Sequence, residues 1–243
     1  DILTNIDHPY AAKRPPIDSH YFETFNKDHV TLVDIQTDPI AEITHNGIVL
    51  QSGAQHKLDV IVFATGYDAM TGPLLNLNIE TSKASLKSYW KGGPRNYLGL
   101  AIPGFPNLFT ITGPGSPSVL SNMPVSIEQH VDWITECIAY CIKTECTSIE
   151  AQEQSAEIWT DHVRETADAT LLPKVQHSWY LGANIPGKPR VFMPYAGGLN
   201  TYRKICNNIS KEGYKGFILN SEKTGEILKS LDFLSSEGVS LGV

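Results

Sequence analysis

Four short stretches of this sequence carry side chains that could take part in chemistry. The first is KRPP, residues 13–16, where a basic pair precedes two prolines. A guanidinium has a permanent charge and five donors, so Arg14 beside a proline-stiffened turn could stabilise an anion that forms during a reaction. Without further context, a basic pair on an exposed turn is solvated surface charge, and this alternative stays open.

The second stretch is DVIVFATGYD, residues 59–68, where an apolar run ends in small residues. Such residues let a backbone approach a partner closely, because no long side chain holds the partner away. Tyr67 and Asp68 follow Gly66 directly, which favours contact with a flat ligand. The alternative is a plain turn, since small residues end many strands.

The third stretch is TGPGSPSVLSNMP, residues 112–124, which precedes a predicted helix. The last residues before that helix are Ser121, Asn122 and Met123. A helix start offers unpaired N–H groups and a partial positive charge, which suit an electron-rich ring edge such as the N1–C2=O2 edge of a flavin. An ordinary Gly/Pro/Ser loop is the alternative.

The fourth stretch is SWYLGANIPGKPR, residues 178–190. The indole N–H of Trp179 could donate to a ribose or an amide of a bound cofactor once the loop folds over it. Lys188 and Arg190 would then lie near phosphate. Alternatively, Trp179 only anchors the loop in a core.

The elements that must position these stretches alternate between strands and helices. Length and β-branched content predict strands at 30–35, 47–50, 58–64 and 107–112, of which the last two have the composition of strands buried on both faces. Together with the helices that follow, these strands predict an α/β fold.

Two helices are predicted in the second half of the chain. The first spans 124–143 and carries an apolar residue every third or fourth position, at Ile127, Val131, Ile134, Ile138 and Ile142. The second spans 149–172 and ends before Pro173, with Ile158, Trp159, Val163 and Leu171 expected toward the core. Residues 175–200 are too rich in Gly and Pro for a helix, so we predict an ordered functional loop that leads into a strand.

Composition excludes several classes of protein. The chain has 243 residues, 41% of them hydrophobic, and a formal net charge of −7 without any basic run, which argues against a nucleic-acid partner. No stretch has the length of a membrane span, and residues 1–10 lack the pattern of a signal peptide, so a cytoplasmic location is expected. The four cysteines have neither metal-ligand nor disulfide spacing; we predict reduced thiols and no metal site.

No GxGxxG motif occurs anywhere in the chain. That motif places the phosphates of a dinucleotide on a helix start, so a dinucleotide site cannot be complete within this sequence. The predicted strands are therefore expected to be the last members of a larger sheet. We expect the chain, which begins with Asp1 rather than Met, to be a fragment that lacks an N-terminal half.

Taken in order, five stretches resemble the C-terminal part of a Baeyer–Villiger monooxygenase of the phenylacetone and cycloalkanone type. They are KRPPIDSHYFETFN, DVIVFATGYDAMTG, WKGGPRNYLGLAIPGFPNLFTITGPGSPSVLSNM, SIEQHVDWI and SWYLGANIPGKPRVFMPYAGG. The resemblance covers roughly residues 9–219, and the collinear set is specific, whereas ATG alone occurs in other flavin monooxygenases.

The resemblance implies an enzyme that uses FAD, NADPH and O2 to insert one oxygen atom beside a ketone carbonyl through a flavin peroxide, giving an ester or lactone. Carried over by motif, the catalytic arginine is Arg14, which also contacts NADP together with Lys13 and Trp179. Gly66, Asn122 and Met123 would contact FAD. The ketone would meet Tyr67, Ser118, Val119 and Leu120.

The same resemblance implies a partial Rossmann-like, doubly wound fold, the C-terminal portion of a flavoprotein with two dinucleotide-binding domains. Residues 1–29 would end the NADP-binding domain and its linker. Residues 30–243 would belong to the FAD-binding domain, with a helical segment at 124–172 and an NADP-closing loop at 175–200. Two alternatives stay open: a flavin monooxygenase that oxidises nitrogen or sulfur, and a truncated remnant without catalysis.

Overall fold

The structure, a computed structural model, describes residue 3, residues 8–10 and residues 12–220. The chain forms two units, residues 1–67 and 68–243, and each is described by itself. This division follows packing within the chain, and the assignment of 1–29 and 30–243 to cofactor domains stays a prediction.

The first unit contains a short helix and a three-stranded antiparallel meander. The helix is α1 (Tyr21–Thr24), and the strands, in sheet order, are β1 (Ile40–Thr44), β2 (Gly47–Leu50) and β3 (Gln55–Lys57). The predicted strand at 47–50 is thus confirmed. Gly47 is required there, because its φ is +143° and an added Cβ would lie 1.9 Å from the carbonyl oxygen of His56.

Two other predicted strands of this unit are wrong. Residues 30–34 are irregular, and residues 58–64 are irregular and largely exposed, with Val60, Val62 and Phe63 at 75, 81 and 70% exposure. Apolar, β-branched composition makes a segment suited to a sheet, but a strand also needs neighbours that pair its N–H and C=O groups. Within the described residues, β3 ends at Lys57 and no strand follows before the second unit.

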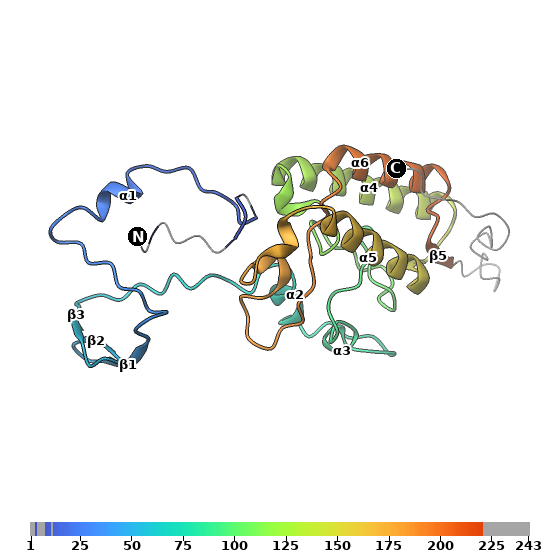
Figure 1. Cartoon of the computed structure of the whole chain (residues 1–243). Helices are drawn as coiled ribbons and strands as arrows, with labels where there is room; N and C mark the ends of the chain where they lie inside the picture. Colours follow the sequence, from blue (N-terminus) through green and yellow to red (C-terminus); the bar gives the residue numbers. More distant parts are fainter. Residues whose placement is uncertain (1–2, 4–7, 11, 221–243) are drawn as a thin grey trace. The chain divides into compact units, whose positions relative to one another are not determined.

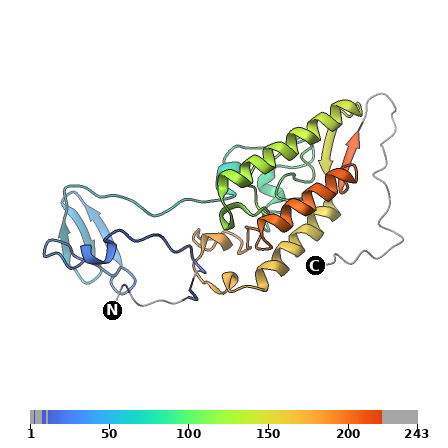
Figure 2. The same cartoon turned by 90° about the horizontal axis from the view of Figure 1, so that it is seen from above.

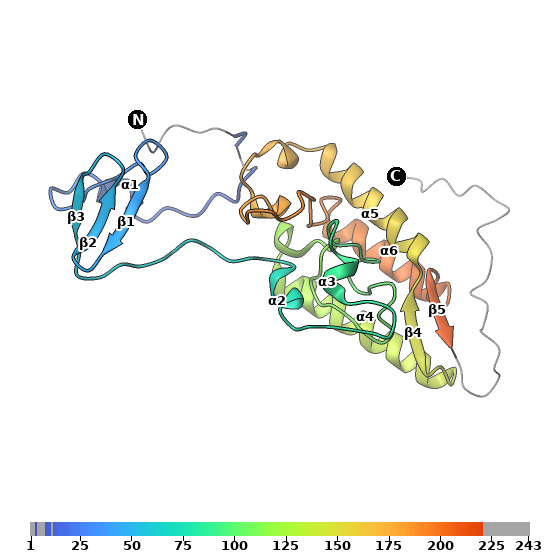
Figure 3. The same cartoon turned by 90° about the horizontal axis from the view of Figure 1, so that it is seen from below.

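The second unit is built from three long helices, a two-stranded ribbon and short turns of helix (Figure 2). The long helices are α4 (Met123–Lys143), α5 (Glu153–Asp168) and α6 (Leu199–Lys211), and α4 packs against α6 (Figure 1). The ribbon pairs β4 (Ser148–Ala151) with β5 (Phe217–Asn220) in antiparallel register (Figure 3). The short elements are α2 (Gly72–Leu75), α3 (Leu86–Tyr89), η2 (Ser118–Leu120), η3 (Leu172–Lys174) and η4 (Trp179–Leu181).

The sequence-based expectations for this unit are partly confirmed. The helix predicted at 124–143 is α4, whereas the helix predicted at 149–172 is shorter, because 148–151 form strand β4 and the helix ends at Asp168. The predicted strand at 107–112 is wrong. Within the described structure, the β-pairing of these residues is limited to one isolated bridge between Phe109 and Ala101. The loop at 175–200 does not lead into a strand; α6 begins at Leu199.

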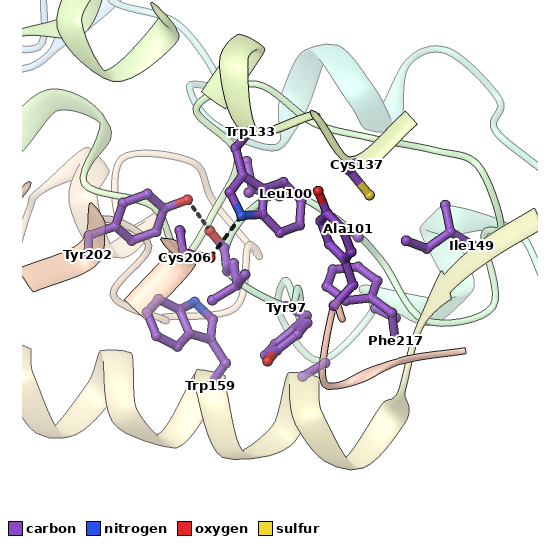
Figure 4. Packing of buried hydrophobic residues seen from close by; sticks show 14 of the residues in the cluster. Tyr97, Leu100, Ala101, Trp133, Cys137, Ile149, Trp159, Tyr202, Cys206 and Phe217 are labelled. Carbon is purple, nitrogen blue, oxygen red and sulfur yellow. Dashed lines mark hydrogen bonds between the residues drawn. The ribbon is translucent and has the colours of Figure 1, made fainter. Parts of the chain in front are cut away.

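Aromatic side chains dominate the core of the second unit (Figure 4). Their polar atoms are satisfied by backbone carbonyls: Trp133 Nε1 donates to Cys206 O at 2.9 Å, and Tyr202 Oη donates to Leu98 O at 2.7 Å. Trp159 and Val163 of α5 are buried as expected, while Ile158 and Leu171 are about half exposed, at 47 and 50%. These buried donors fix α4, α5 and α6 around one cluster.

Helix α4 buries an unexpected face. Its buried residues are Ser126, Gln129, His130, Trp133 and Cys137, whereas four members of the apolar stripe are exposed. Only Ile134 of that stripe packs partly against the core. None of the described helices combines the length and the apolarity that crossing a membrane requires.

His130 is completely buried on this helix. Its Nδ1 accepts from the N–H of Thr112 at 2.9 Å, so the proton of the neutral ring sits on Nε2, which has no partner among the described residues. Burial lowers the pKa of His130 to about 4, because the charged imidazolium is poorly solvated there.

This burial predicts a loss of stability in mild acid. The unfolded chain takes up a proton at the ordinary histidine pKa of about 6.5, well before the folded chain does, so the free energy of unfolding should fall as the pH drops from about 6.5 toward 4. We expect the fall to reach on the order of 2 kcal/mol at pH 5, measured by urea unfolding at pH 7 and pH 5.

The variant His130→Asn retains an acceptor for Thr112 and should show a smaller difference between the two pH values. Exposed His177→Asn serves as the control and should behave like the original chain. An unchanged pH difference in His130→Asn would contradict the assignment.

Candidate functional site

The predicted site residues are divided between the two units. Lys13, Arg14, Gly66 and Tyr67 belong to the first unit. The second unit holds Ser118, Val119, Leu120, Asn122, Met123 and Trp179. The structure brings members of the second group together, and the approach of the two groups stays a prediction.

In the first unit, the side chain of Arg14 is exposed beside Pro15, while Lys13 is half-buried next to the buried Ala12. Gly66 has φ +87° and faces open space, since an added Cβ would meet no atom within 4 Å. A residue with a side chain would be strained at this φ. The backbone at Gly66 is therefore accessible, and the Tyr67 ring after it is 88% exposed.

In the second unit, the turn before α4 is held by hydroxyl groups. Ser121 Oγ donates to Ser118 O at 2.9 Å and lies 2.6 Å from Ser126 Oγ. Ser118 is buried with φ +46°, an uncommon value for a residue with a side chain, and its hydroxyl lies 3.6 Å from Met70 Sδ. This fixed turn presents Val119 and Leu120.

The start of α4 is largely capped by its own residues. Asn122 is the N-cap and its Oδ1 accepts from the N–H of Val125 at 3.5 Å, while Pro124 has no N–H. The N–H of Ser126 donates to Asn122 O at 3.1 Å. Among the described residues, the N–H of Met123 is therefore the backbone donor in the first turn of α4 that has no acceptor.

The loop at 175–193 is ordered by contacts with its own chain. Arg190 donates to the carbonyl oxygens of Gln176 and Val175, and Lys188 forms an ion pair with Asp68 and donates to Ala69 O at 3.2 Å. The side chain of Lys188 is only 11% exposed. Both cations expected near phosphate thus already have partners inside the second unit.

Trp179 differs from the other three tryptophans in its hydrogen bonding. The indoles of Trp90, Trp133 and Trp159 donate to backbone carbonyl oxygens at 3.4, 2.9 and 3.0 Å. Among the residues that the structure describes, Trp179 has no such acceptor; its ring is partly buried and packs edge-on against Tyr180. An indole donor without an acceptor in the described part of the chain is available to a ligand.

A small apolar cluster brings Trp179 to the turn before α4. The buried members are Ala167, Tyr180, Leu181 and Phe192, and Val119, Leu120 and Trp179 pack against them. Three of the predicted site residues, from stretches about sixty positions apart, are thus part of one packed group.

Backbone pairing fixes this arrangement. The N–H of Gly115 donates to Met193 O and the N–H of Tyr195 donates to Ser116 O, each at 2.7 Å. Gly113 packs so closely on Gly99 that an added Cβ would lie 2.6 Å from Gly99 O. The glycines of the 113–115 stretch are therefore explained by packing inside the unit.

A cavity of about 450 Å³ lies against the inner side of the loop. It is lined by Trp159 and Val163 of α5, by Phe192 and Met193, and by Asn96 among others. Asn96 is 3% exposed, and its side-chain oxygen and nitrogen have no hydrogen-bond partner within the described structure. Among the residues that the sequence analysis placed near a ligand, Arg190 alone lines this cavity.

The pair between Asp68 and Lys188 was missed by the sequence analysis. The two residues lie 120 positions apart, and nothing local marks them as partners. Gly72 packs directly on Asp68, where an added Cβ would lie 2.6 Å from the carboxyl carbon. The glycine four residues after Asp68 could have indicated that the Asp68 side chain packs against its own turn. It could not have indicated that Lys188 is the ionic partner of Asp68.

Comparison with known proteins found close relatives. No protein-family model matches the chain. It is 41% identical over 214 residues to cyclohexanone 1,2-monooxygenase of Acinetobacter, and 42% identical over 208 residues to a Baeyer–Villiger monooxygenase of Pseudooceanicola batsensis. The alignments cover 88 and 85% of this chain but only 39 and 38% of those proteins.

A relative that is named for a different activity has a similar identity to this chain. Phenazine N-monooxygenase PhzNO1 of Lysobacter antibioticus is 40% identical over 217 residues, with 89% of this chain and 40% of that protein covered. Among solved structures, an oxidised steroid monooxygenase bound to NADP superposes with a TM-score of 0.81 at 47% identity, covering 90% of this chain and 41% of that one. The chain therefore spans about two fifths of the length of the proteins it matches.

The Asp68–Lys188 pair predicts a variant with a loosened loop. Lys188→Met should raise amide exchange in residues 182–191 by about tenfold, because a largely buried ammonium anchors the loop and its removal leaves Asp68 unpaired. Hydrogen exchange followed by mass spectrometry measures the change. Lys215→Met, which removes an exposed pair with Glu212, is the control and should leave the loop unchanged. Equal exchange in Lys188→Met and the original chain would show that the pair does not anchor the loop.

Proposed function

We propose that this chain is part of a Baeyer–Villiger monooxygenase, an enzyme that uses FAD, NADPH and O2 to insert one oxygen atom beside a ketone carbonyl. The proposal is supported by 42% identity to a Baeyer–Villiger monooxygenase and 41% identity to a cyclohexanone 1,2-monooxygenase over most of this chain. The product is an ester or a lactone. The observation that carries this proposal is the packed group of Val119, Leu120 and Trp179 beside the start of α4. The indole of Trp179 has no acceptor among residues 12–220, so it is available to a cofactor.

Three residues fit the edge of a flavin. Gly66 offers an accessible backbone in a conformation that favours glycine, and Met123 offers an N–H at the positive end of a 21-residue helix. Asn122 supports this donor by capping the same helix. A flavin held by these residues would supply the redox chemistry, namely acceptance of hydride from NADPH and transfer of oxygen from O2 to the ketone.

Three residues fit the nicotinamide cofactor. The indole of Trp179 donates to its ribose or amide, and Lys13 and Arg14 supply positive charge. Since Lys188 and Arg190 are engaged within the loop, we assign them to holding the loop in place and not to phosphate.

Four residues are proposed to surround the ketone. Tyr67 provides an exposed ring, and Ser118, Val119 and Leu120 form the turn η2. The backbone of this turn is fixed by Ser121 and Ser126, so the side chains of Val119 and Leu120 set the shape available to the substrate.

Arg14 is proposed as the catalytic residue. Its guanidinium would hold the negative charge that develops on the oxygen of the reacting carbonyl, where a charge-assisted hydrogen bond in a site without water is strong. The exposed position of Arg14 beside the rigid Pro15-Pro16 pair suits a donor that meets a ligand. Lysine would substitute poorly, because it lacks the planar fork of donors.

The proposed partners follow from the same assignment. They are a ketone, O2 and the part of a longer family protein that this chain does not span. We place the enzyme in the cytoplasm.

Oxidation of a ring nitrogen is the second candidate function. The observation that favours it is the 40% identity to a phenazine N-monooxygenase, which is close to the 41% identity to cyclohexanone 1,2-monooxygenase. A truncated remnant without catalysis is the remaining alternative.

A chimera tests the proposal: this chain replaces the matching part of the Acinetobacter cyclohexanone 1,2-monooxygenase. We expect the chimera to convert cyclohexanone to its lactone with consumption of NADPH, and Arg14→Ala to lose at least a hundredfold of lactone formation while NADPH still reduces the flavin. Product analysis by gas chromatography and flavin absorbance measure the two steps. An unimpaired lactone yield in Arg14→Ala would remove the role given to this residue.

Phenazine supplied to the same chimera separates the two candidate functions. Formation of the N-oxide without any lactone would favour the second candidate.

The chain by itself should not retain FAD, because it contains no GxGxxG motif for the phosphates. A stoichiometric flavin spectrum of the purified chain would contradict that expectation.

A further inference from the structure

Three rings pack on one another beside the turn at 113–116, two from helix α5 and one from the chain after the loop. Trp159 and Tyr195 stack with their ring centroids 5.3 Å apart, and His162 lies tilted against both rings, with centroid distances of 5.4 and 5.5 Å. Trp159 is 5% exposed and Tyr195 is 1% exposed, so the stacked pair is held inside the second unit. We call these three rings the aromatic group.

The aromatic group is joined to the turn at 113–116 by two hydrogen bonds. Trp159 Nε1 donates to Gly115 O at 3.0 Å, and the N–H of Tyr195 donates to Ser116 O at 2.7 Å. Gly115 lies so close to the indole that an added Cβ would be 3.1 Å from Trp159 Nε1. Two consecutive carbonyl oxygens of the turn therefore accept hydrogen bonds from the aromatic group.

The turn is connected to η2 through one rigid residue. Pro117 joins Ser116 to η2, and the proline ring fixes its φ, which is −55° here. Ser116 is fully buried, and its hydroxyl donates to Gly113 O at 2.8 Å. Because Pro117 leaves little freedom of rotation, a displacement of Ser116 would move η2 with it.

The cavity of about 450 Å³ borders the same turn. Pro114, Gly115 and Trp159 are among the residues that line it. A turn that borders a cavity depends on its hydrogen bonds more than a turn packed on all sides, since fewer protein atoms oppose its movement. Loss of the bond from Trp159 would therefore let the turn move toward the cavity.

The third ring of the aromatic group holds Tyr195 in place. His162 Nε2 lies 3.2 Å from Tyr195 Oη, within hydrogen-bond distance. Burial lowers the pKa of His162 and raises the pKa of Tyr195, so both rings are uncharged at neutral pH. An uncharged pair can stay packed against Trp159 without a counterion.

We propose that Trp159 is a positioning residue, which sets ketone preference from α5 without touching the ketone. Its indole holds Gly115, and Gly115 and Ser116 hold η2. The proposal rests on the proposed function, in which Val119 and Leu120 of η2 face the ketone. It adds that the place of these two side chains is set by a hydrogen bond from a residue 44 positions away from Gly115 in the sequence.

The chimera with the Acinetobacter cyclohexanone 1,2-monooxygenase tests this role. Trp159→Phe keeps a stacked ring and removes the N–H donor, so the turn should move toward the cavity and leave more room for a bulky ketone. We expect the ratio of kcat/KM for phenylacetone to kcat/KM for cyclohexanone to rise about fivefold, while NADPH reduces the flavin at an unchanged rate. Product analysis at several ketone concentrations measures the ratio, which a smaller fraction of folded enzyme would not alter.

Trp133→Phe is the matched control. Trp133 is a buried tryptophan of the same core, and its indole also donates to a backbone carbonyl oxygen, that of Cys206 at 2.9 Å (Figure 4). Its replacement should lower stability to a similar extent and leave the ratio for the two ketones unchanged. An unchanged ratio in Trp159→Phe, a shift toward cyclohexanone, or an equal shift in Trp133→Phe would overturn the proposal.

Tyr195→Phe is a second variant that keeps the core filled. It removes only the hydroxyl that lies against His162, and it should shift the ratio in the same direction by about twofold. Should Trp159→Phe not fold, an unchanged ratio in Tyr195→Phe would overturn the proposal.

Hydrogen exchange separates this proposal from the proposed function. In the chain without cofactor, Trp159→Phe should raise amide exchange at residues 118–121 by about tenfold relative to Trp133→Phe, because η2 loses its support. If exchange rises but the chimera forms no lactone, the function fails and the positioning of η2 by Trp159 stands. If lactone forms while exchange and ratio are both unchanged, the function stands and Trp159 has no positioning role.

Discussion

The candidate site depends on two backbone hydrogen bonds that join distant parts of the second unit. Gly115 bonds to Met193 and Tyr195 bonds to Ser116, and the indole of Trp159 donates to Gly115 O on the same turn. These bonds place the loop that bears Trp179 against the turn that bears Val119. Without them, an apolar cluster of partly buried side chains would have to hold a long, proline-rich loop by itself, at a high cost in conformational entropy.

Local pattern predicted the parts of the fold that are local. Helix α4 was found from its apolar spacing, and β2 from a short β-branched run before a turn. The run at 58–64 failed because a strand is defined by its neighbours, and its composition alone reveals only that it suits a sheet. Helix α6 was missed because its sequence, LNTYRKICNNISK, is mostly polar, although Tyr202 and Cys206 four residues apart mark its buried side.

The roles of the proposed site residues stay predictions, and the structure bears only on which of these residues lie together. Stretches that resemble a family pattern gave Trp179 and the turn at 118–120, and the structure packs them together. Long-range pairing carried no signal, so the partner of Lys188 was inferred as phosphate although the chain itself supplies Asp68. The spacing of apolar residues in α4 also did not predict that this apolar face is exposed. Periodicity indicates that a helix has an apolar face, but not which part of the protein packs against that face.

The tight packing of Gly99 against Ser116 and Gly113 has a consequence for how this protein can change over evolutionary time. An added Cβ at Gly99 would lie 2.6 Å from Ser116 N, so the backbone that supports η2 tolerates no replacement there. Val119 and Leu120 stand on that rigid support and are only partly buried. With the ketone-facing role proposed for Val119 and Leu120, exchange of these two side chains would change substrate preference while the scaffold beneath them stays the same.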